Sequence, residues 1–92
     1  MNPERSFRTM IQIHFEKEHT RAAAYDGTTQ IGVCTIKQTA DGWEIPHTEV
    51  DPAYGGQGIA RKLVLCVAEQ AKKEGVRVFP TCSYAKKVLL EE

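Results

Sequence analysis

A glycine-rich loop at residues 54–58, Tyr-Gly-Gly-Gln-Gly, constrains the fold of this chain more than any other segment. The preceding residues, 43–50, have the pattern of a strand. After the loop, apolar residues recur at four-residue spacing from Ile59 and predict one apolar stripe of a helix that runs to about Glu74, with Gly75 as its stop. Glycine lets a backbone adopt positive φ and come close to a ligand. The junction of strand and helix is therefore a predicted binding site as well as a change of secondary structure.

The residues after this helix complete a β-α-β unit. Residues 76–79 are mostly apolar and predict a short strand. A right-handed crossover places that strand parallel to residues 44–50 in the same sheet. A last helix is predicted over residues 85–90, with Thr81 or Ser83 as its N-terminal cap.

The first half of the chain predicts an antiparallel meander. Apolar residues alternate with polar ones over residues 11–15, which is the period of a half-buried strand. The predicted strands, separated by turn signals, cover residues 11–15, 21–25, 30–36 and 43–50. The alanine run at 22–24 would equally suit a helix. Pro46 indicates a bulge or an irregular edge in the last of these strands.

Ninety-two residues make one small domain rather than two. We therefore expect a single domain over residues 1–92, in which residues 1–8 are flexible. Its predicted fold class is α+β, with a mixed sheet formed by the antiparallel meander, the β-α-β unit and a C-terminal helix. Twelve Lys plus Arg balance twelve Asp plus Glu, so the chain has no global attraction for nucleic acid or for an anionic membrane. Any anion site must be local.

The three cysteines, Cys34, Cys66 and Cys82, form neither a CxxC pair nor a Cys/His cluster with zinc spacing. Their odd number, and a start that lacks the apolar stretch of a secretory signal, predict reduced thiols in a cytoplasmic protein without a metal site. No apolar run approaches the ~18 residues that a membrane span needs.

The glycine loop suits a phosphate or a pyrophosphate. The amides of residues 55–60 can point into one concavity at the start of a helix, whose dipole favours an anion, and Arg61 and Lys62 add charge on the first turn. A P-loop would need Gly-Lys-Ser/Thr, but Gly58 is followed by Ile-Ala, and Arg61 stands where a dinucleotide fingerprint has its third glycine. A flexible loop that caps the helix explains the glycines equally well.

The segment 50–64, VDPAYGGQGIARKLV, resembles the acetyl-CoA loop of the GNAT N-acetyltransferase superfamily. The core pattern of that loop is Arg/Gln-x-x-Gly-x-Gly/Ala. Gly58 and Ala60 match its last two conserved positions, whereas Gly55 stands where Arg or Gln is usual.

Two further segments resemble a small, truncated GNAT-like subfamily that carries a Cys-Ser-Tyr/Phe segment. These are His-Thr-Glu-Val at residues 47–50, before the loop, and Pro-Thr-Cys-Ser-Tyr at residues 80–84, after the next strand. The resemblance covers roughly residues 24–90 and implies a GNAT-like mixed sheet.

The resemblance implies that acetyl-CoA, or coenzyme A, is the cofactor. The loop amides would hold the pyrophosphate, and residues 48–50 would hydrogen-bond the pantetheine arm as an extra strand. In the superfamily this strand and the next splay apart, and a backbone N–H near Thr48 would polarise the acetyl carbonyl in the gap. Such a donor is typically worth about a hundred- to a thousand-fold in rate. The implied cofactor-binding residues are Thr48, Val50, Gly55, Gly56, Gln57, Gly58, Ile59, Ala60, Arg61, Ser83 and Tyr84.

Acetyl transfer needs an amine without its proton, attack on the thioester and protonation of the departing thiolate. Larger relatives often use a tyrosine on the last helix as the acid, and this chain has Leu89 and Leu90 at roughly corresponding positions. Cys82, at a helix start where the pKa of a thiol is lowered, would protonate the thiolate or accept the acetyl group as a nucleophile. A bystander thiol is the alternative. His47, or Glu49 through a water, would be the base; a histidine that only bonds backbone is the alternative.

The sequence therefore predicts a small acetyl-CoA-dependent N-acetyltransferase with an unidentified amine acceptor. A non-catalytic sensor of CoA or acyl-CoA is one alternative, and a protein-interaction module with an available edge strand is another. The chain lacks the early helices that shape the acceptor site in larger relatives. The acceptor is then a large amine, such as a protein lysine or N-terminus, or a dimer completes the site. A monomer or a weak homodimer is expected.

Overall fold

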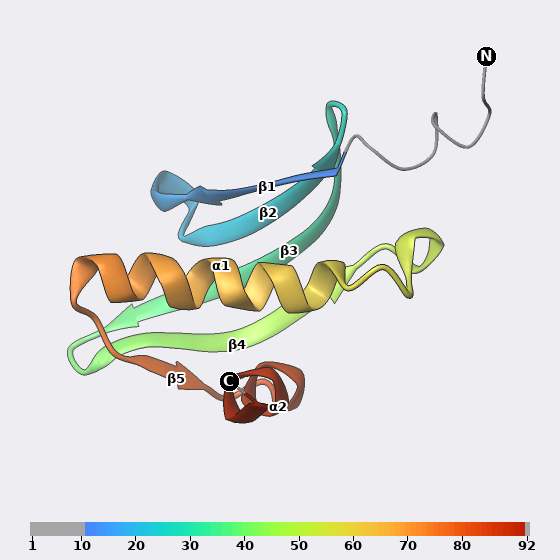
Figure 1. Cartoon of the computed structure of the whole chain (residues 1–92). Coiled ribbons are helices and arrows are strands. Elements are labelled where there is room, and N and C mark those ends of the chain that lie inside the picture. Colours follow the sequence, from blue (N-terminus) through green and yellow to red (C-terminus); the bar gives the residue numbers. More distant parts are fainter. Residues whose placement is uncertain (1–10, 92) are drawn as a thin grey trace, which may run out of the picture.

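The computed structural model describes residues 11–91, and its strands form one sheet with a helix lying across it (Figure 1). The strands are β1 (Ile11–Glu16), β2 (Arg21–Asp26), β3 (Thr29–Thr39), β4 (Gly42–Val50) and β5 (Val78–Pro80), and the helices are α1 (Ile59–Glu74) and α2 (Ser83–Glu91). The strands lie in the order β1-β2-β3-β4-β5. Neighbours from β1 to β4 are antiparallel, whereas β5 is parallel to β4. The predicted α+β class and mixed sheet are confirmed.

The expected flexible start, residues 1–8, lies outside the described residues. The expectation of a single domain over residues 1–92 therefore stays a prediction. Within residues 11–91, no helix is long and apolar enough to cross a membrane.

The meander follows the predicted strands. In β1, Gln12 and His14 are exposed and alternate with half-buried apolar residues. The alanine run 22–24 is fully buried in β2. It forms a strand because β1 and β3 pair with β2 on its two sides and satisfy its backbone groups. Ala22 and Ala24 belong to the core that α1 covers, where small side chains let the helix lie close to the sheet.

Helix α1 covers one face of the sheet with the apolar stripe that the sequence predicts (Figure 1). Its buried residues are Ile59, Leu63, Val64, Val67 and Ala71. Burying one such leucine or valine is worth about 1.5–3 kcal/mol relative to leaving it exposed. The helix lies so close to β3 that a Cβ on Gly32 would be 3.2 Å from Leu63 Cδ1. It ends at Gly75, whose φ of +70° is left-handed, as predicted.

A bulge interrupts β4 at the predicted position. Thr35 of β3 pairs with His47, but Lys37 pairs with Glu44, so two residues of β4 oppose one residue of β3. The extra residue shifts the alternation of side chains, and Pro46 lies in it. Before the bulge, Ile45 faces the core, and after it the even-numbered residues do.

Beyond the bulge, β4 and β5 part. Strand β5 pairs only with residues 43–45 of β4. The carbonyl oxygen of Ile45 then accepts the N–H of Thr81 at 3.1 Å and that of Cys82 at 2.9 Å, and the chain turns into α2. Residues 46–50 of β4 have no strand beside them on this edge within the described chain. The gap that the resemblance implies is present.

Strand β5 begins later than predicted, at Val78 instead of Val76. Val76 is needed to close α1, because its N–H donates to the carbonyl oxygen of Ala71 at 2.9 Å. Arg77 makes the first bond to the sheet, through its carbonyl oxygen and the N–H of Trp43 at 2.8 Å. The predicted parallel pairing with β4 is confirmed.

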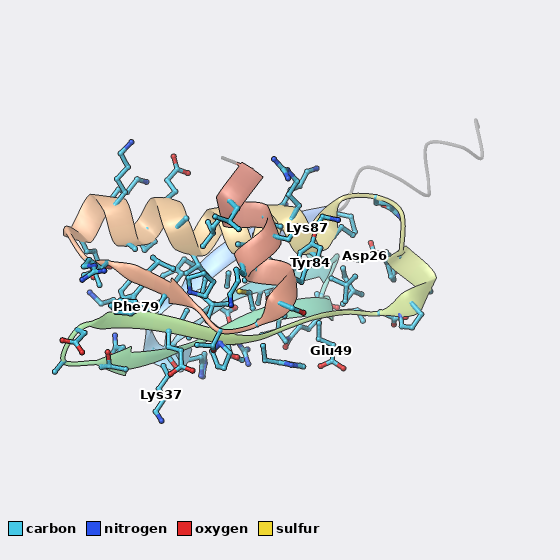
Figure 2. The ribbon with its side chains drawn as sticks, turned by 90° about the horizontal axis from the view of Figure 1, so that it is seen from below. Asp26, Lys37, Glu49, Phe79, Tyr84 and Lys87 are labelled. Carbon is cyan, nitrogen blue, oxygen red and sulfur yellow. The ribbon has the colours of Figure 1, made fainter. Side chains whose placement is uncertain are left out.

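The second face of the sheet carries no helix in the described part of the chain. Figure 2 shows Lys37 and Glu49 pointing away from the sheet on the side opposite α1 and α2. Both residues are exposed, as are His14 and His47, which lie on the same face. We call this surface the open face.

Candidate functional site

A pocket of about 280 Å³ lies where β4 ends and α1 begins. We call it the cradle. Its lining residues are Val50, Tyr54, Gly55, Gly56, Gly58, Ile59, Ala60 and Tyr84. All but Tyr54 are among the predicted cofactor-binding residues, so the fold brings the loop, the end of β4 and the start of α2 to one place.

Two glycines give the cradle its shape. Gly56 and Gly58 have φ values of +80° and +74°, a left-handed conformation that side chains disfavour. A Cβ at either position would meet no atom within 4 Å. The backbone conformation, and not a lack of room, therefore requires glycine, and the space beside the loop is open to a ligand.

The start of α1 offers its N–H groups to this space. Gly58 is the N-cap and has no side chain to accept a hydrogen bond, and the first turn holds no acidic residue. The first bond within the helix is from Lys62 N–H to Gly58 O, at 3.1 Å. The N–H groups of Ile59 and Ala60 precede that bond, at the end of the helix where N–H groups have no acceptor within the helix. Together with the helix dipole they favour an anion.

Tyr54 is a cradle residue that the sequence analysis missed. Its hydroxyl donates to the carboxylate of Asp26, at the end of β2. This hydrogen bond, with a smaller contribution from burial, raises the pKa of Tyr54. The bond ties the glycine loop to the turn between β2 and β3. An aromatic residue beside the glycines is visible in the sequence, but its distant partner is not.

Cys82 caps α2. The helix begins at Ser83, and the N–H of Lys86 donates to the carbonyl oxygen of Cys82 at 2.9 Å. The predicted caps, Thr81 and Ser83, are wrong: Thr81 Oγ1 lies 2.8 Å from Glu44 Oε2, and Ser83 is already helical. The sulfur at the cap position takes the place that a serine oxygen usually has.

The surroundings of Cys82 lower its pKa. Burial of the thiol acts to raise the pKa, but the N–H groups of Ala85 and Tyr84 and then the hydroxyl and N–H of Thr48 outweigh it. Burial dominates at the other two cysteines. It raises the pKa of Cys34 to about 11, and it also raises the pKa of Cys66. Cys82 is thus the one cysteine of the chain whose pKa its surroundings lower.

Thr48 lies between two sulfur atoms. It pairs with Cys34 across β3 and β4, and its hydroxyl donates to Cys34 Sγ at 3.5 Å. The same hydroxyl and the backbone N–H of Thr48 also help to lower the pKa of Cys82. The predicted N–H donor and the predicted catalytic thiol are therefore neighbours at the gap.

His47 and Glu49 lie on the open face, away from Thr48 and Val50. Their side chains are 58% and 69% exposed, and His47 Nε2 is 3.3 Å from Glu49 Oε1. Glu49 also lines a hollow of about 440 Å³, together with Val50 and neighbouring residues of β3. Val50 thus lines both this hollow and the cradle.

A family model described as GCN5-related N-acetyl-transferase matches residues 21–92. The chain belongs to the GCN5-related N-acetyltransferase (GNAT) family. This confirms the family that the loop and the two flanking segments indicate. No curated protein matches the chain.

Solved structures of larger acetyltransferases share the fold. N-acetylglutamate synthase from Neisseria gonorrhoeae, complexed with coenzyme A and N-acetyl-glutamate, is 20% identical with a TM-score of 0.65, over 88% of this chain and 21% of that one. An aminoglycoside acetyltransferase from an uncultured soil metagenomic sample, in complex with trehalose, is 18% identical with a TM-score of 0.58, over 77% of this chain and 51% of that one. This GNAT chain thus spans about a fifth and about half of the lengths of these two proteins.

Some of the predicted site residues of this GNAT chain lie beside the cradle without lining it. Gln57 is exposed in the loop, Arg61 lies on the first turn of α1 and Ser83 is exposed on the first turn of α2. Glu44 was not predicted, yet it lies on the open face with His47 and Glu49. The bulge at Pro46 is the signal that could have placed it there, because the extra residue brings positions 44, 47 and 49 to one face.

Proposed function

We propose that this GNAT protein is an acetyl-CoA-dependent N-acetyltransferase. The observation that carries the proposal is one continuous path: the cradle opens at Val50, the unpaired edge of β4 leads on to Thr48, and Cys82 lies beside Thr48. An anion site, a free strand edge and a thiol of lowered pKa, in that order, match the pyrophosphate, the pantetheine arm and the thioester of acetyl-CoA.

The residues present fit this cofactor. No lining residue of the cradle is acidic, and N–H groups at the start of α1 lack helical acceptors. Along β4, the N–H of Asp51 donates to Ile31 O of β3 at 2.8 Å. Because successive N–H groups of a strand point to opposite edges, those of Val50 and Thr48 point into the gap. They would bond the pantetheine arm and the acetyl carbonyl.

Acetyl-CoA supplies a thioester, and the chain would supply three groups to its reaction with an amine. The N–H of Thr48 donates to the carbonyl oxygen as negative charge develops there. When bound, acetyl-CoA would supply its acetyl group to the amine nitrogen, and its sulfur would leave as the thiolate of CoA. Cys82 gives its proton to the departing sulfur, for which the lowered pKa of its thiol is suited. The proton of the attacking amine passes to the pair of His47 and Glu49 on the open face.

The acceptor would approach from the open face. In the described chain that face has no covering helix, and Glu49 lines a broad hollow there. The cradle lies on the other side of Val50. Cofactor and acceptor would thus meet across β4, where the gap beside residues 46–50 joins the two sides. An uncovered face suits an amine on a large molecule, such as a protein lysine or N-terminus.

Calorimetric titration with CoA, beside intact-protein mass spectrometry after mixing with acetyl-CoA, tests the proposal. We expect CoA to bind. An adduct of one acetyl group that is lost in Cys82→Ala would assign a covalent route through this thiol, and binding without an adduct would assign direct transfer. If CoA did not bind, the proposal would be overturned, together with the interpretation of the glycine loop as a site for its pyrophosphate.

A sensor of CoA or acyl-CoA is the second candidate. It is favoured by the open face, where the side chains of His47 and Glu49 are more than half exposed and contact each other. Incubation with acetyl-CoA and a panel of free amines and lysine peptides separates the two functions. Tight CoA binding without transfer to any acceptor would favour the sensor.

A further inference from the structure

Lys87 lies on α2 beside the cradle. Figure 2 shows Lys87 and Tyr84 on the same side of this helix, the side toward the glycine loop. Residues three apart on a helix are surface neighbours. Tyr84 lines the cradle, so Lys87 lies on the side of α2 that borders it.

Packing fixes this orientation of α2. Ala85 and Val88 are 0% and 2% exposed in the core, so the helix cannot turn about its axis without uncovering them. Lys86 is exposed like Lys87. At about 100° per residue, however, it lies roughly 200° from Tyr84, whereas Lys87 lies roughly 60° away. The two adjacent lysines therefore point to different sides of the same helix.

The cradle itself has no charged side chain among its lining residues. CoA brings a pyrophosphate and a 3′-phosphate, whose oxygens carry several negative charges near neutral pH. On the side of α1, the first turn carries Arg61 and the next position is Lys62. Asp51 and Asp26 flank the loop, but they bond Ala53 N–H and the Tyr54 hydroxyl. On the side of α2, Lys87 is the cation that shares the cradle's face.

We propose that Lys87 binds a phosphate group of CoA, so that α2 closes the anion site from the side opposite α1. This rests on the proposed function. The interaction is that of a mobile point charge with a phosphate oxygen, the way in which lysine recognises phosphate. Lys87 thereby gives α2 a second role: Cys82 at its start faces the thioester, and Lys87 one turn later faces the phosphates.

The test compares Lys87→Gln with Lys86→Gln by calorimetric titration with CoA. Both variants lose one positive charge from exposed, adjacent positions of one helix. We expect Lys87→Gln to weaken CoA binding about tenfold, the size of one charge-assisted hydrogen bond. Lys86→Gln should stay within about twofold of the parent, because it loses only a distant, screened charge. Lys87→Arg should retain most of the affinity.

Comparison of CoA with two of its fragments, 3′-dephospho-CoA and pantetheine, identifies the phosphate. If Lys87 binds the 3′-phosphate, Lys87→Gln loses no affinity for 3′-dephospho-CoA. If it binds the pyrophosphate, the loss is the same for 3′-dephospho-CoA and CoA. Neither variant should change the binding of pantetheine, which has no phosphate.

Equal losses in Lys86→Gln and Lys87→Gln, or no loss in either, would overturn the role of Lys87 and leave the proposed function standing. Failure of the unsubstituted protein to bind CoA would overturn both proposals. Thermal unfolding of each variant serves as the fold control. It should change little, because exposed substitutions away from the core rarely alter stability strongly.

Discussion

The two sides of residues 47–50 in β4 are built differently. Thr48 and Val50 face the gap and the cradle, where the start of α2 and the glycine loop meet. His47 and Glu49 face the open side, where more than half of each side chain is exposed and each contacts the other. One short strand thus borders a preformed pocket, the cradle, with one set of side chains and forms part of the open face with the other.

This difference separates the two tasks that acetyl transfer requires. Groups that are already ordered bind a ligand at little entropic cost, whereas exposed side chains must be ordered on binding. The cradle side is therefore suited to recognise a cofactor by itself. The open side depends on the shape of the acceptor, or on a second chain, to complete recognition. Substitutions on the two sides should affect different measurements.

The largest effect is expected at Cys82. Cys82→Ala should lower acetyl transfer by at least about a hundredfold, because loss of a positioned acid typically costs 10²–10⁴ in rate. CoA affinity should be spared. Cys66→Ala, at a half-buried thiol of α1, is the matched control and should leave transfer unchanged. The measurement is the rate of CoA release with a lysine peptide that serves as acceptor. Full activity of Cys82→Ala would remove the thiol from the mechanism.

Next in size is a substitution in the glycine loop. Gly58→Ala and Gly75→Ala place a methyl group at left-handed positions at the two ends of α1, with open space around each. Both should cost about 1 kcal/mol of unfolding free energy. Gly58→Ala should also weaken CoA binding several-fold, since it shifts the N–H groups of the cradle. Denaturation and calorimetry of both variants provide the test. If Gly75→Ala weakened CoA binding as much as Gly58→Ala, the assignment of the cradle as the CoA site would be contradicted.

A smaller effect is expected from the hydroxyl of Thr48. Thr48→Val removes a hydrogen bond that helps to lower the pKa of Cys82, so the pKa should rise toward its ordinary value. Iodoacetamide labelling followed by mass spectrometry over a pH series should then require higher pH for the same rate at Cys82. Thr35→Val, on the neighbouring strand and the open face, is the control. An unchanged labelling profile in Thr48→Val would exclude this contact as a cause of the lowered pKa.

The same labelling experiment should give the opposite result at Cys34, because the pKa of this thiol is raised and not lowered. Its pKa is raised to about 11 by burial, so its neutral thiol favours the folded state. That stabilisation is fully present below the ordinary thiol pKa and is lost as the pH rises toward about 11. Labelling of Cys34 should follow global unfolding, whereas labelling of Cys82 should precede it.

The fold could be predicted because its signals are local. The alternation in β1, the stripe of α1 and the stop at Gly75 each lie within one element, and each is confirmed. The ambiguous alanine run at 22–24 could not be assigned from its own composition, because pairing with β1 and β3 decides it. The start of β5 moved for a similar reason, since Val76 closes α1.

The candidate site could be predicted where its residues are close together in sequence, but not where its contacts join residues that are far apart in sequence. The loop and the end of β4 are continuous in sequence, and most of their predicted residues line the cradle. The bond from Tyr54 to Asp26 joins positions 28 apart, and the contact between Thr48 and Cys34 crosses two strands. Cys82 was expected near a helix start, but its role as the cap itself follows from the bond that its carbonyl oxygen accepts from Lys86 N–H, while its own N–H is held by the Ile45 carbonyl of distant β4.

The smallest effects should come from the open side. Glu49→Gln should leave CoA affinity within about twofold and unfolding free energy within about 0.5 kcal/mol, because exposed ion pairs contribute little. His47→Gln should behave in the same way. Each residue is 3.3 Å from the other, so one can accept a proton when the other is replaced. Only the double substitution should then slow transfer strongly. If either single change weakened CoA binding as much as Gly58→Ala does, cofactor and acceptor sides would not be separate, and the assignment of β4's two sides would be wrong.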